Sequence, residues 1–558
     1  MRAQITKKVT PMNQRRLSLM MIAGALLLTA PAWAAAPGIT TNTATAGSFA
    51  LTAQEAYLNQ PDGNQVYAWG YGCTANSTPA FKPQLPNQTC STMQVPGPTL
   101  IVTEGQPVTV TLTNNLPVPA GNTSILFPDF SVTTSCGAAT PSGVQGLLTC
   151  EAAPAGQVTY TFTATTPGTH TYYSGTQGDL QIEMGLYGAI IVLPANVPIA
   201  CNTGVHLANQ QAQSAASAAH PGKTETDFRL ASAAYDHPGS CYDREYLFQF
   251  AEMDLNIHRT ALAQVTQATS LAACKAGQFG CSLQVPTEPY HPNYYVINGR
   301  SMPDDMDPNF DPVYPHQPYN GNPHMHPGEL VLVRVIGQGR WQHPFHEHGN
   351  HVRILGRDGN LIKSVSDTYS PTLGTGTDAL AGPLLFTTTT TPGQAFDGIF
   401  YWTGRGLNWD AYGHNPDSSV ASAKLTCTPD VNGYNTGAPL AINYFEWCQD
   451  HNKPLQAAPF GDVPGGGPAT LPDANIVANG AWYSGSPYLG HDATTRATGP
   501  NSVFQPSNVQ ANPDNERGYA FMWHSHNERE ITTNNVFPGG MFMMMLVDSR
   551  EFVIDESN

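Results

Sequence analysis

Hydrophobic and polar residues alternate with a period of two along much of this chain. Residues 108–112 read Val-Thr-Val-Thr-Leu, and residues 158–162 read Val-Thr-Tyr-Thr-Phe. Because successive side chains of a β-strand point to opposite faces of a sheet, each segment is predicted to be a strand with one buried face. Gly, Pro and Asn mark tight turns between such segments. The pattern predicts an all-β protein built from β-sandwiches with long loops.

The alternating segments fall into two groups, which predict two domains. We expect the first within residues 35–200, where 35–85 alternate weakly and form an extension packed on the domain. We expect the second within residues 239–558. Residues 201–238, rich in Ala, Gln and Ser, are predicted to be a linker. The segment from about residue 403 to residue 515 is rich in Gly, Pro and Asn and is predicted to be a long insertion in the second domain.

The N-terminus has the pattern of a cleaved signal peptide. Residues 1–34 contain a basic start, an apolar run at 17–28 and a small-x-small site at Ala32-Trp33-Ala34. The apolar run is too short to span a bilayer, and no later segment is apolar enough to do so. We therefore expect a secreted or periplasmic protein.

Charge and cysteine content narrow the classes of partner and the cellular compartment. The formal net charge is −17, which argues against nucleic acid and anionic membranes as partners. The chain has ten cysteines, an even number that is typical of an oxidising compartment. Their spacing predicts five local disulfides: Cys73/Cys90, Cys136/Cys150, Cys201/Cys241, Cys274/Cys281 and Cys427/Cys448.

Two histidine motifs carry the candidate chemistry. His346 and His348 are two residues apart, as are His524 and His526, so each pair shares one face of a strand. Neutral imidazole is the commonest transition-metal ligand, and four imidazoles suit tetrahedral zinc or tetragonal copper. If the fold brings the pairs together, they predict a site for copper, with zinc as an alternative. The other interpretation is four histidines that are hydrogen-bonded in a groove without a metal.

These motifs, with several others, resemble the multicopper oxidases, most closely the two-domain small laccases. The resemblance implies two Greek-key cupredoxin-like domains, one mononuclear blue copper and a three-copper centre that is held by histidines of four His-x-His motifs. It also implies a possible homotrimer with the three-copper centres between subunits. The matching segments are Pro96-Gly97-Pro98-Thr99, Val296-Ile297-Asn298-Gly299-Arg300-Ser301, His343-Pro344-Phe345-His346-Glu347-His348, Pro392-Gly393, Trp523-His524-Ser525-His526 and Gly540-Met541.

The resemblance assigns roles to five histidines of the second domain. His343 matches a ligand of the blue site, and the other four match ligands of the three-copper centre: His346, His348, His524 and His526. In the first domain, Leu126-Phe127-Pro128 and Tyr173-Ser174-Gly175 occupy the positions where its two motifs are expected. Half of the ligands for three coppers are therefore absent. Rebuilding them with Asp129 or Tyr173 is a conceivable alternative.

The blue site also departs from the family pattern. Ser525 replaces its cysteine, Glu530 replaces its next histidine, and Met541 is the expected axial position. Because blue copper depends on a cysteine thiolate, we expect no laccase-type turnover. His343 and Glu530 could form a second, weaker metal site. The alternative is a salt bridge, for example with Arg529 or Arg353.

Three functions remain open from the sequence. The first is a copper-binding (or zinc-binding) protein for storage, delivery or structural order. The second is an enzyme, a non-blue copper oxidoreductase with His343 and Glu530 near the substrate. The third is a metal-free interaction protein of the cell envelope. His324 and His326 could be an accessory copper site or part of a polar loop.

Overall fold

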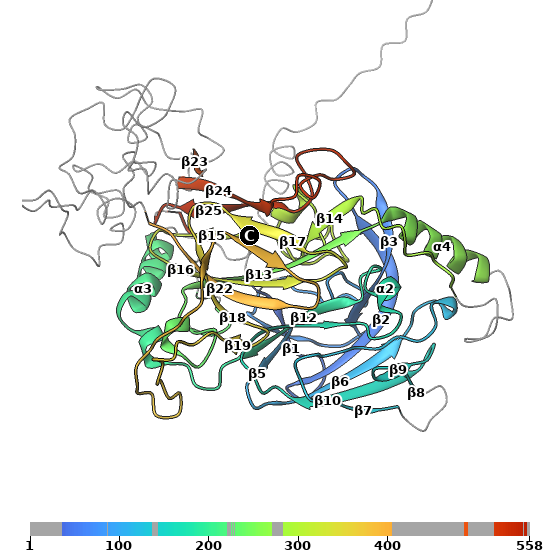
Figure 1. The fold of residues 1–558 in the computed structure, drawn as a ribbon, viewed down its shortest axis with the longest axis horizontal. Coiled ribbons are helices and arrows are strands. Elements are labelled where there is room, and N and C mark those ends of the chain that lie inside the picture. The colour runs from blue at the N-terminus through green and yellow to red at the C-terminus, as the bar shows by residue number, and fades with distance from the viewer. Residues whose placement is uncertain are drawn as a thin grey trace, which may run out of the picture.

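Two β-sandwiches lie against each other in the computed structural model (Figure 1). Helices are few, and the longest are α3 (Gly204–Ala219) and α4 (Leu255–Thr269). The all-β fold predicted from the alternation is confirmed. The structure describes residues 36–85, 87–136, 143–219, 225, 227, 229–269, 283–403, 485–488, 518–550 and 552–554.

The first sandwich contains two five-stranded sheets, in the orders β11-β12-β5-β1-β4 and β3-β2-β6-β10-β7. A two-stranded ribbon, β8 and β9, and the short helix α2 (Gly178–Gln181) accompany it. Its strands are β1 (Gly38–Thr41), β2 (Ser48–Asn59), β3 (Gln65–Cys73), β4 (Ala80–Lys82), β5 (Leu100–Thr103), β6 (Pro107–Asn114), β7 (Thr133–Ser135), β8 (Gly143–Gln145), β9 (Cys150–Ala152), β10 (Gln157–Thr163), β11 (Gly168–Tyr173) and β12 (Tyr187–Leu193).

The second sandwich pairs the sheet β14-β13-β16-β22-β18-β19, with β20 beside β18, and the sheet β15-β25-β24-β17-β21, with β23 beside β24. Its first sheet contains β13 (Arg244–Met253), β14 (Tyr294–Ile297), β16 (Leu330–Gly337), β18 (Val352–Arg357), β19 (Asn360–Leu361), β20 (Leu384–Leu385) and β22 (Ala395–Tyr401). Its second contains β15 (His324–Met325), β17 (His343–Glu347), β21 (Thr387–Thr390), β23 (Gly485–Tyr488), β24 (Gly518–Ser525) and β25 (Phe542–Asp548).

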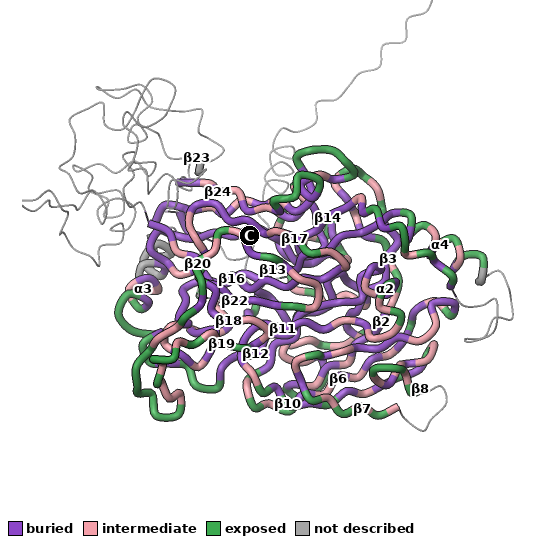
Figure 2. The backbone as a smooth tube through the Cα atoms, viewed as in Figure 1, coloured by how far each residue is buried: buried purple, intermediate pink, exposed green. Residues whose placement is uncertain are grey.

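The alternation in the sequence matches the alternation of burial. In β10, Val158, Tyr160 and Phe162 are buried, and the threonines between them are half-buried or exposed. In the second sandwich, Phe345 of β17 and Trp523 of β24 are fully buried in the core between the sheets. Figure 2 shows this buried interior as continuous purple through both sandwiches. Burial of such faces is the main favourable contribution to folding.

The N-terminal segment differs from its prediction as an extension. Residues 38–82 supply β1 to β4, and β2 lies between β3 and β6 inside a sheet. In β2, Phe49, Leu51 and Ala53 are buried at every second position, so the first half of this strand has one buried face. Strand pairing on both sides, which the sequence does not reveal, fixes this segment in the sandwich.

The segment predicted as a linker contains α3, and three polar side chains of this helix are buried against the second sandwich. His206 and Asn209 contact Asp243, and Gln213 donates to Glu329. Helices that pack by polar contacts lack an apolar stripe, so hydrophobic periodicity does not predict them.

Three of the five predicted disulfides are confirmed: Cys73–Cys90, Cys136–Cys150 and Cys201–Cys241. The remaining pairs, Cys274/Cys281 and Cys427/Cys448, lie outside the described residues, as do the predicted signal peptide and most of the predicted insertion. Within that insertion, β23 pairs with β24.

Candidate metal centre

The two histidine motifs lie on neighbouring antiparallel strands of the second sandwich. The register of β17 and β24 places His346 opposite His524 and Phe345 opposite Ser525. Because Phe345 and Trp523 point into the core, the alternation turns His346 and His524 to the other face of the sheet. The fold therefore brings the two motifs together, which is the condition for the metal site expected from the sequence.

Four imidazoles form a compact cluster on that face. His346 has its ring centroid 4.8 Å from those of His348 and His526 and 5.6 Å from that of His524. The rings of His348 and His524 are 5.2 Å apart, with their Nε2 atoms 3.3 Å from each other. We call these four residues the His cluster. It has a buried side at His346 and His348, and an exposed side at His526.

Neighbouring oxygen atoms orient two of the rings. His524 Nδ1 lies 2.6 Å from the carbonyl oxygen of Ser525, so it donates a hydrogen bond and Nε2 carries the lone pair. His346 Nδ1 lies 2.6 Å from Thr387 Oγ1. Such hydrogen bonds from one ring nitrogen are the usual support for a histidine that binds a metal through the other nitrogen.

Burial favours the neutral form of two of these imidazoles, His346 and His524. It lowers the pKa of His346 to about 4, and the nearby His526 and His524 lower this pKa further. Burial also lowers the pKa of His524. Neutral imidazole is the form that binds a metal, so these residues are in the form required at pH 7.

The side chains at the expected blue-site position lie on the core side of the same strands. His343 Nε2 is 2.9 Å from Glu252 Oε2, and His343 Nδ1 is 2.9 Å from Glu530 Oε2. Ser525 Oγ donates to the same Glu530 carboxylate, and Met541 is buried nearby in the core. His343 and Glu530 therefore contact each other, and the second carboxylate that contacts His343 is Glu252. The salt-bridge alternative named an arginine as the partner.

The arginines that the sequence offered for that salt bridge bind elsewhere. Arg529 donates to Tyr295 Oη and to the carbonyl oxygen of Pro292. Arg353 donates to the carbonyl oxygen of Gly382.

The first-domain positions carry hydrogen-bonded or apolar groups. Leu126 and Tyr173 pair through their backbones, and Ser174 Oγ donates to Gln181. Asp129, a conceivable replacement ligand, lies 2.9 Å from His170 Nδ1.

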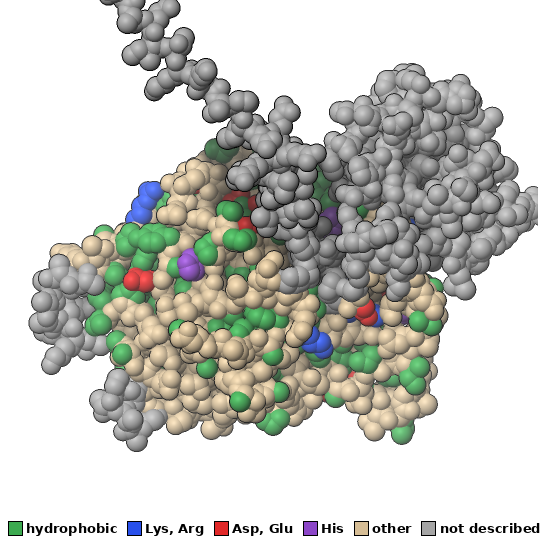
Figure 3. Space-filling view, turned by 180° about the vertical axis from the view of Figure 1, so that it is seen from behind, with side chains coloured by type: hydrophobic (Ala, Val, Ile, Leu, Met, Phe, Trp, Pro, Cys, Tyr) green, Lys and Arg blue, Asp and Glu red, His purple; other side chains and the backbone are tan. Residues whose placement is uncertain are grey.

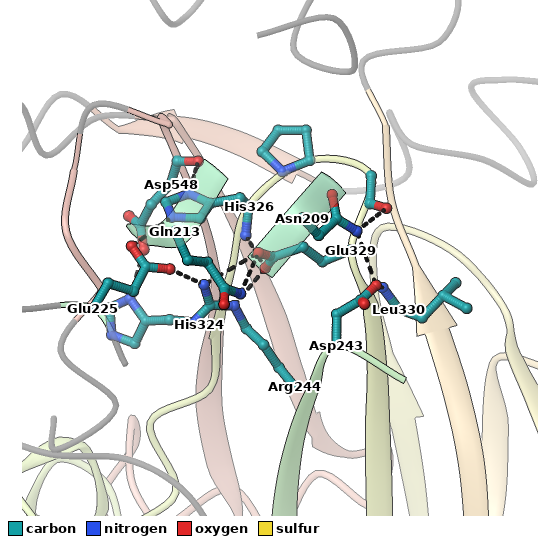
Figure 4. Close-up of polar contacts among 12 residues, drawn as sticks. Asn209, Gln213, Glu225, Asp243, Arg244, His324, His326, Glu329, Leu330 and Asp548 are labelled. Atoms are coloured by element: carbon teal, nitrogen blue, oxygen red, sulfur yellow. Dashed lines mark hydrogen bonds and ion pairs between the residues drawn. The ribbon is translucent and has the colours of Figure 1, made fainter. Parts of the chain in front are cut away.

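His324 and His326 are buried and do not form a solvated loop; His324 belongs to β15, at the edge of the sheet that also contains β17 and β24. Figure 4 shows them in a buried polar network, where His324 contacts Asp548 and His326 Nε2 lies 3.2 Å from Glu225. Arg244 binds both Glu225 and Glu329 in this network. Both oxygens of Glu329 accept hydrogen bonds from protein donors, so this carboxylate fastens α3 and the C-terminal segment to β13.

Sequence reasoning missed two residues of these sites. Glu252 comes from β13, and Thr387 from β21. No motif or spacing marks either residue, because each reaches its histidine only through sheet pairing and packing.

Comparisons with known proteins agree with the motifs. Residues 80–197 match the sequence model of the multicopper oxidase family. Over these residues the chain is similar to the multicopper oxidases. It is 35% identical over 99 residues to an L-ascorbate oxidase of Brassica rapa subsp. pekinensis, and 36% identical over 115 residues to laccase-3 of Botryotinia fuckeliana. These matches cover 16% and 22% of the two relatives, so the chain aligns with less than a quarter of either.

Among solved structures, the blue copper oxidase of Nitrosomonas europaea aligns over 90% of this chain and 85% of its own, with 16% identity and a TM-score of 0.41. The sheet orders described above show two β-sandwiches, the architecture predicted from the sequence.

The described helices and surface have two further features. Among the described residues, no helix is long and apolar enough to cross a membrane. On the face shown in Figure 3, the Lys and Arg side chains are few and scattered. A basic patch of the kind that binds nucleic acid is not visible on the described part of that face.

Proposed function

We propose that this protein binds one copper ion, or a zinc ion in its place, through His346, His348, His524 and His526. The observation that carries the proposal is the convergence of four imidazoles from β17, β24 and the residues that follow them. The Nε2 atoms of His348 and His524 lie 3.3 Å apart. At this distance they can share one proton in a hydrogen bond, and small movements of the rings would let both bind one cation.

The donor set fits copper or zinc better than other common metals. Imidazole suits both ions, whereas magnesium and calcium prefer oxygen ligands. Four neutral imidazoles leave the positive charge of the metal uncompensated, which favours a site that is open to solvent on one side, as at His526. When bound, copper would supply a centre that can change oxidation state, and zinc would supply structural order.

The protein's own residues prepare the site. The sheet register fixes the distance between His346 and His524, and the carbonyl of Ser525 selects the tautomer of His524. Thr387 orients His346, and the ring of Phe386 lies beside it, 5.6 Å between centroids. These contacts reduce the reorganisation that metal binding requires.

The residues do not fit the other copper centres of the family. At the blue-site position, Ser525 donates its hydroxyl proton to Glu530, whereas a thiolate ligand would be needed. At the first-domain positions, the side chains of Leu126 and Ser174 offer no imidazole. We therefore infer a metal-binding protein that does not carry out laccase-type turnover.

Copper titration followed by electron paramagnetic resonance tests this function. The expected result is saturation at one copper ion per chain, with hyperfine coupling to several imidazole nitrogens and no intense thiolate-to-copper absorption. Saturation with no nitrogen coupling would contradict the proposed ligands, and an intense thiolate band would contradict the alignment of Ser525.

A further inference from the structure

His343 lies between two buried carboxylates. Its Nε2 is 2.9 Å from Glu252 and its Nδ1 is 2.9 Å from Glu530, on opposite edges of the ring. The Nε2 contact is a hydrogen bond, whereas Nδ1 lies within ion-pair distance of Glu530 without the alignment of a hydrogen bond. All three residues are at most 1% exposed.

Both carboxylates are held as acceptors by other protein groups. Glu252 accepts hydrogen bonds from the backbone amides of Arg340 and Trp341. These two donors favour its ionised form, because hydrogen bonds to a carboxylate stabilise its charge.

Glu530 is held in the same way. It accepts from Ser525 Oγ through one oxygen and from Asn527 Nδ2, at 2.8 Å, through the other. The backbone amide of Asn527 donates to Ser525 Oγ, so the hydroxyl proton must point to Glu530.

A neutral ring cannot satisfy this environment. Neutral imidazole has one N–H group and one lone pair, so one of its nitrogens would face an ionised carboxylate with a lone pair. That repulsion is costly away from water. A doubly protonated imidazolium presents an N–H group to each carboxylate.

We propose that His343 is an imidazolium held between Glu252 and Glu530 and that its protonation excludes a metal ion from this position. With both ring nitrogens protonated, His343 has no lone pair for a metal. The position is the one that the blue copper occupies in the family that the sequence resembles. The proposal concerns the core side of the sheet and does not depend on metal binding by the His cluster.

The surrounding charges are consistent with this assignment. Burial lowers the pKa of His343, but the hydrogen-bonding and electrostatic effects of Glu252 and Glu530 outweigh it and raise this pKa to about 9. A further acid, Glu183, accepts a hydrogen bond from Tyr290 Oη, which lies 3.2 Å from Glu252. The guanidinium of Arg340 lies over the Tyr290 ring at 4.1 Å.

The site also ties three elements together. Glu252 belongs to β13, His343 to β17, and Glu530 to the turn after β24 that begins at Ser525. That turn contains His526, so the imidazolium helps to position one residue of the His cluster from the opposite face.

Nitrogen NMR of the full protein labelled with ¹⁵N-histidine tests the protonation state. The His343 signal is assigned by its loss in His343→Gln, or by its displacement in Glu530→Gln if the first variant does not fold. We expect both ring nitrogens to carry hydrogen at pH 7.5, and Glu530→Gln to lower the pKa of His343 by about 1. A single N–H at pH 7.5 would overturn the proposal.

Copper binding tests the exclusion separately. In the variant His346→Ala/His524→Ala, we expect no copper at the His343 position, so His343→Gln in that background leaves the copper content unchanged. A copper ion that remains in the double variant and disappears with His343→Gln would overturn the exclusion. If the His cluster itself bound no metal, the NMR result would still decide the protonation of His343.

Discussion

His346 and His524 face each other across two antiparallel strands, with ring centroids 5.6 Å apart. The two residues are far apart in the sequence, and only strand pairing makes them neighbours. Because the two-residue period of each strand adds His348 and then His526 to the same face, one register produces the complete cluster. The same register turns Phe345 and Ser525 to the core side.

Metal binding should stabilise the folded protein. A ligand that binds only the folded state at 100 times its Kd adds about 2.7 kcal/mol to the free energy of unfolding. We expect added copper to raise the melting temperature by several degrees, as measured by calorimetry, and a chelator to reverse the change. An increase of the same size in His348→Ala/His526→Ala would show that the stabilisation arises elsewhere.

The core beneath the cluster should be sensitive to cavities. Phe345 is fully buried, with its ring 4.8 Å from that of Phe250 and 6.0 Å from that of Trp523. Phe345→Ala should lower the free energy of unfolding by about 3–5 kcal/mol and weaken metal binding, because it removes support from the strand that carries His346. Denaturant unfolding measures the loss, and Phe345→Leu should cost much less. Equal losses in both variants would mean that packing at this position does not decide the stability.

The imidazolium at His343 makes stability depend on alkaline pH. Its pKa is about 9 in the folded protein and 6.5 as an ordinary histidine, so its contribution is complete below about pH 6.5 and is lost as the pH rises through 9. The whole effect is at most about 3 kcal/mol. Melting temperatures between pH 6.5 and 9.5 should fall more steeply in the wild type than in His343→Gln. Parallel profiles would remove His343 as the cause.

One buried carboxylate joins the two sandwiches. Asp397 of β22 accepts from the backbone amide and the hydroxyl of Thr169 in β11, and it pairs with Arg334 at 3.3 Å. Asp397→Ala should lower the free energy of unfolding by about 3–5 kcal/mol, because it leaves the Arg334 guanidinium with one carboxylate fewer in the interior. Glu288→Ala, which breaks an exposed ion pair with Arg340, is the matched control and should cost less than about 1 kcal/mol. Similar losses in the two variants, measured in urea, would contradict this role of Asp397.

The sequence predicts those features that depend on local patterns. Period-two alternation predicts strands such as β10 and β16, and i,i+2 spacing predicts which histidines share a face. Neighbouring cysteines predict the three observed disulfides, since short loops close readily.

Features that depend on long-range packing are not predicted. The buried partner of His343, Glu252, comes from another sheet. In the sequence, a Glu in a mostly apolar strand indicates a buried acid but does not indicate which residue it contacts. The helix α3 packs by polar side chains such as Asn209, so it lacks the apolar stripe that would predict it from the sequence. It becomes fixed only by the elements on which it packs.

Metal content is the most direct measure of the central claim. Wild-type protein would be purified from its own compartment without added metal and analysed for copper and zinc. The double variant His346→Ala/His524→Ala would be analysed in the same way. The control is His291→Ala, which alters an exposed histidine outside the His cluster. We expect about one copper or zinc ion per chain in the wild type and the control, and a loss of that ion in the double variant. A folded double variant with unchanged metal content would contradict the His cluster as the metal site.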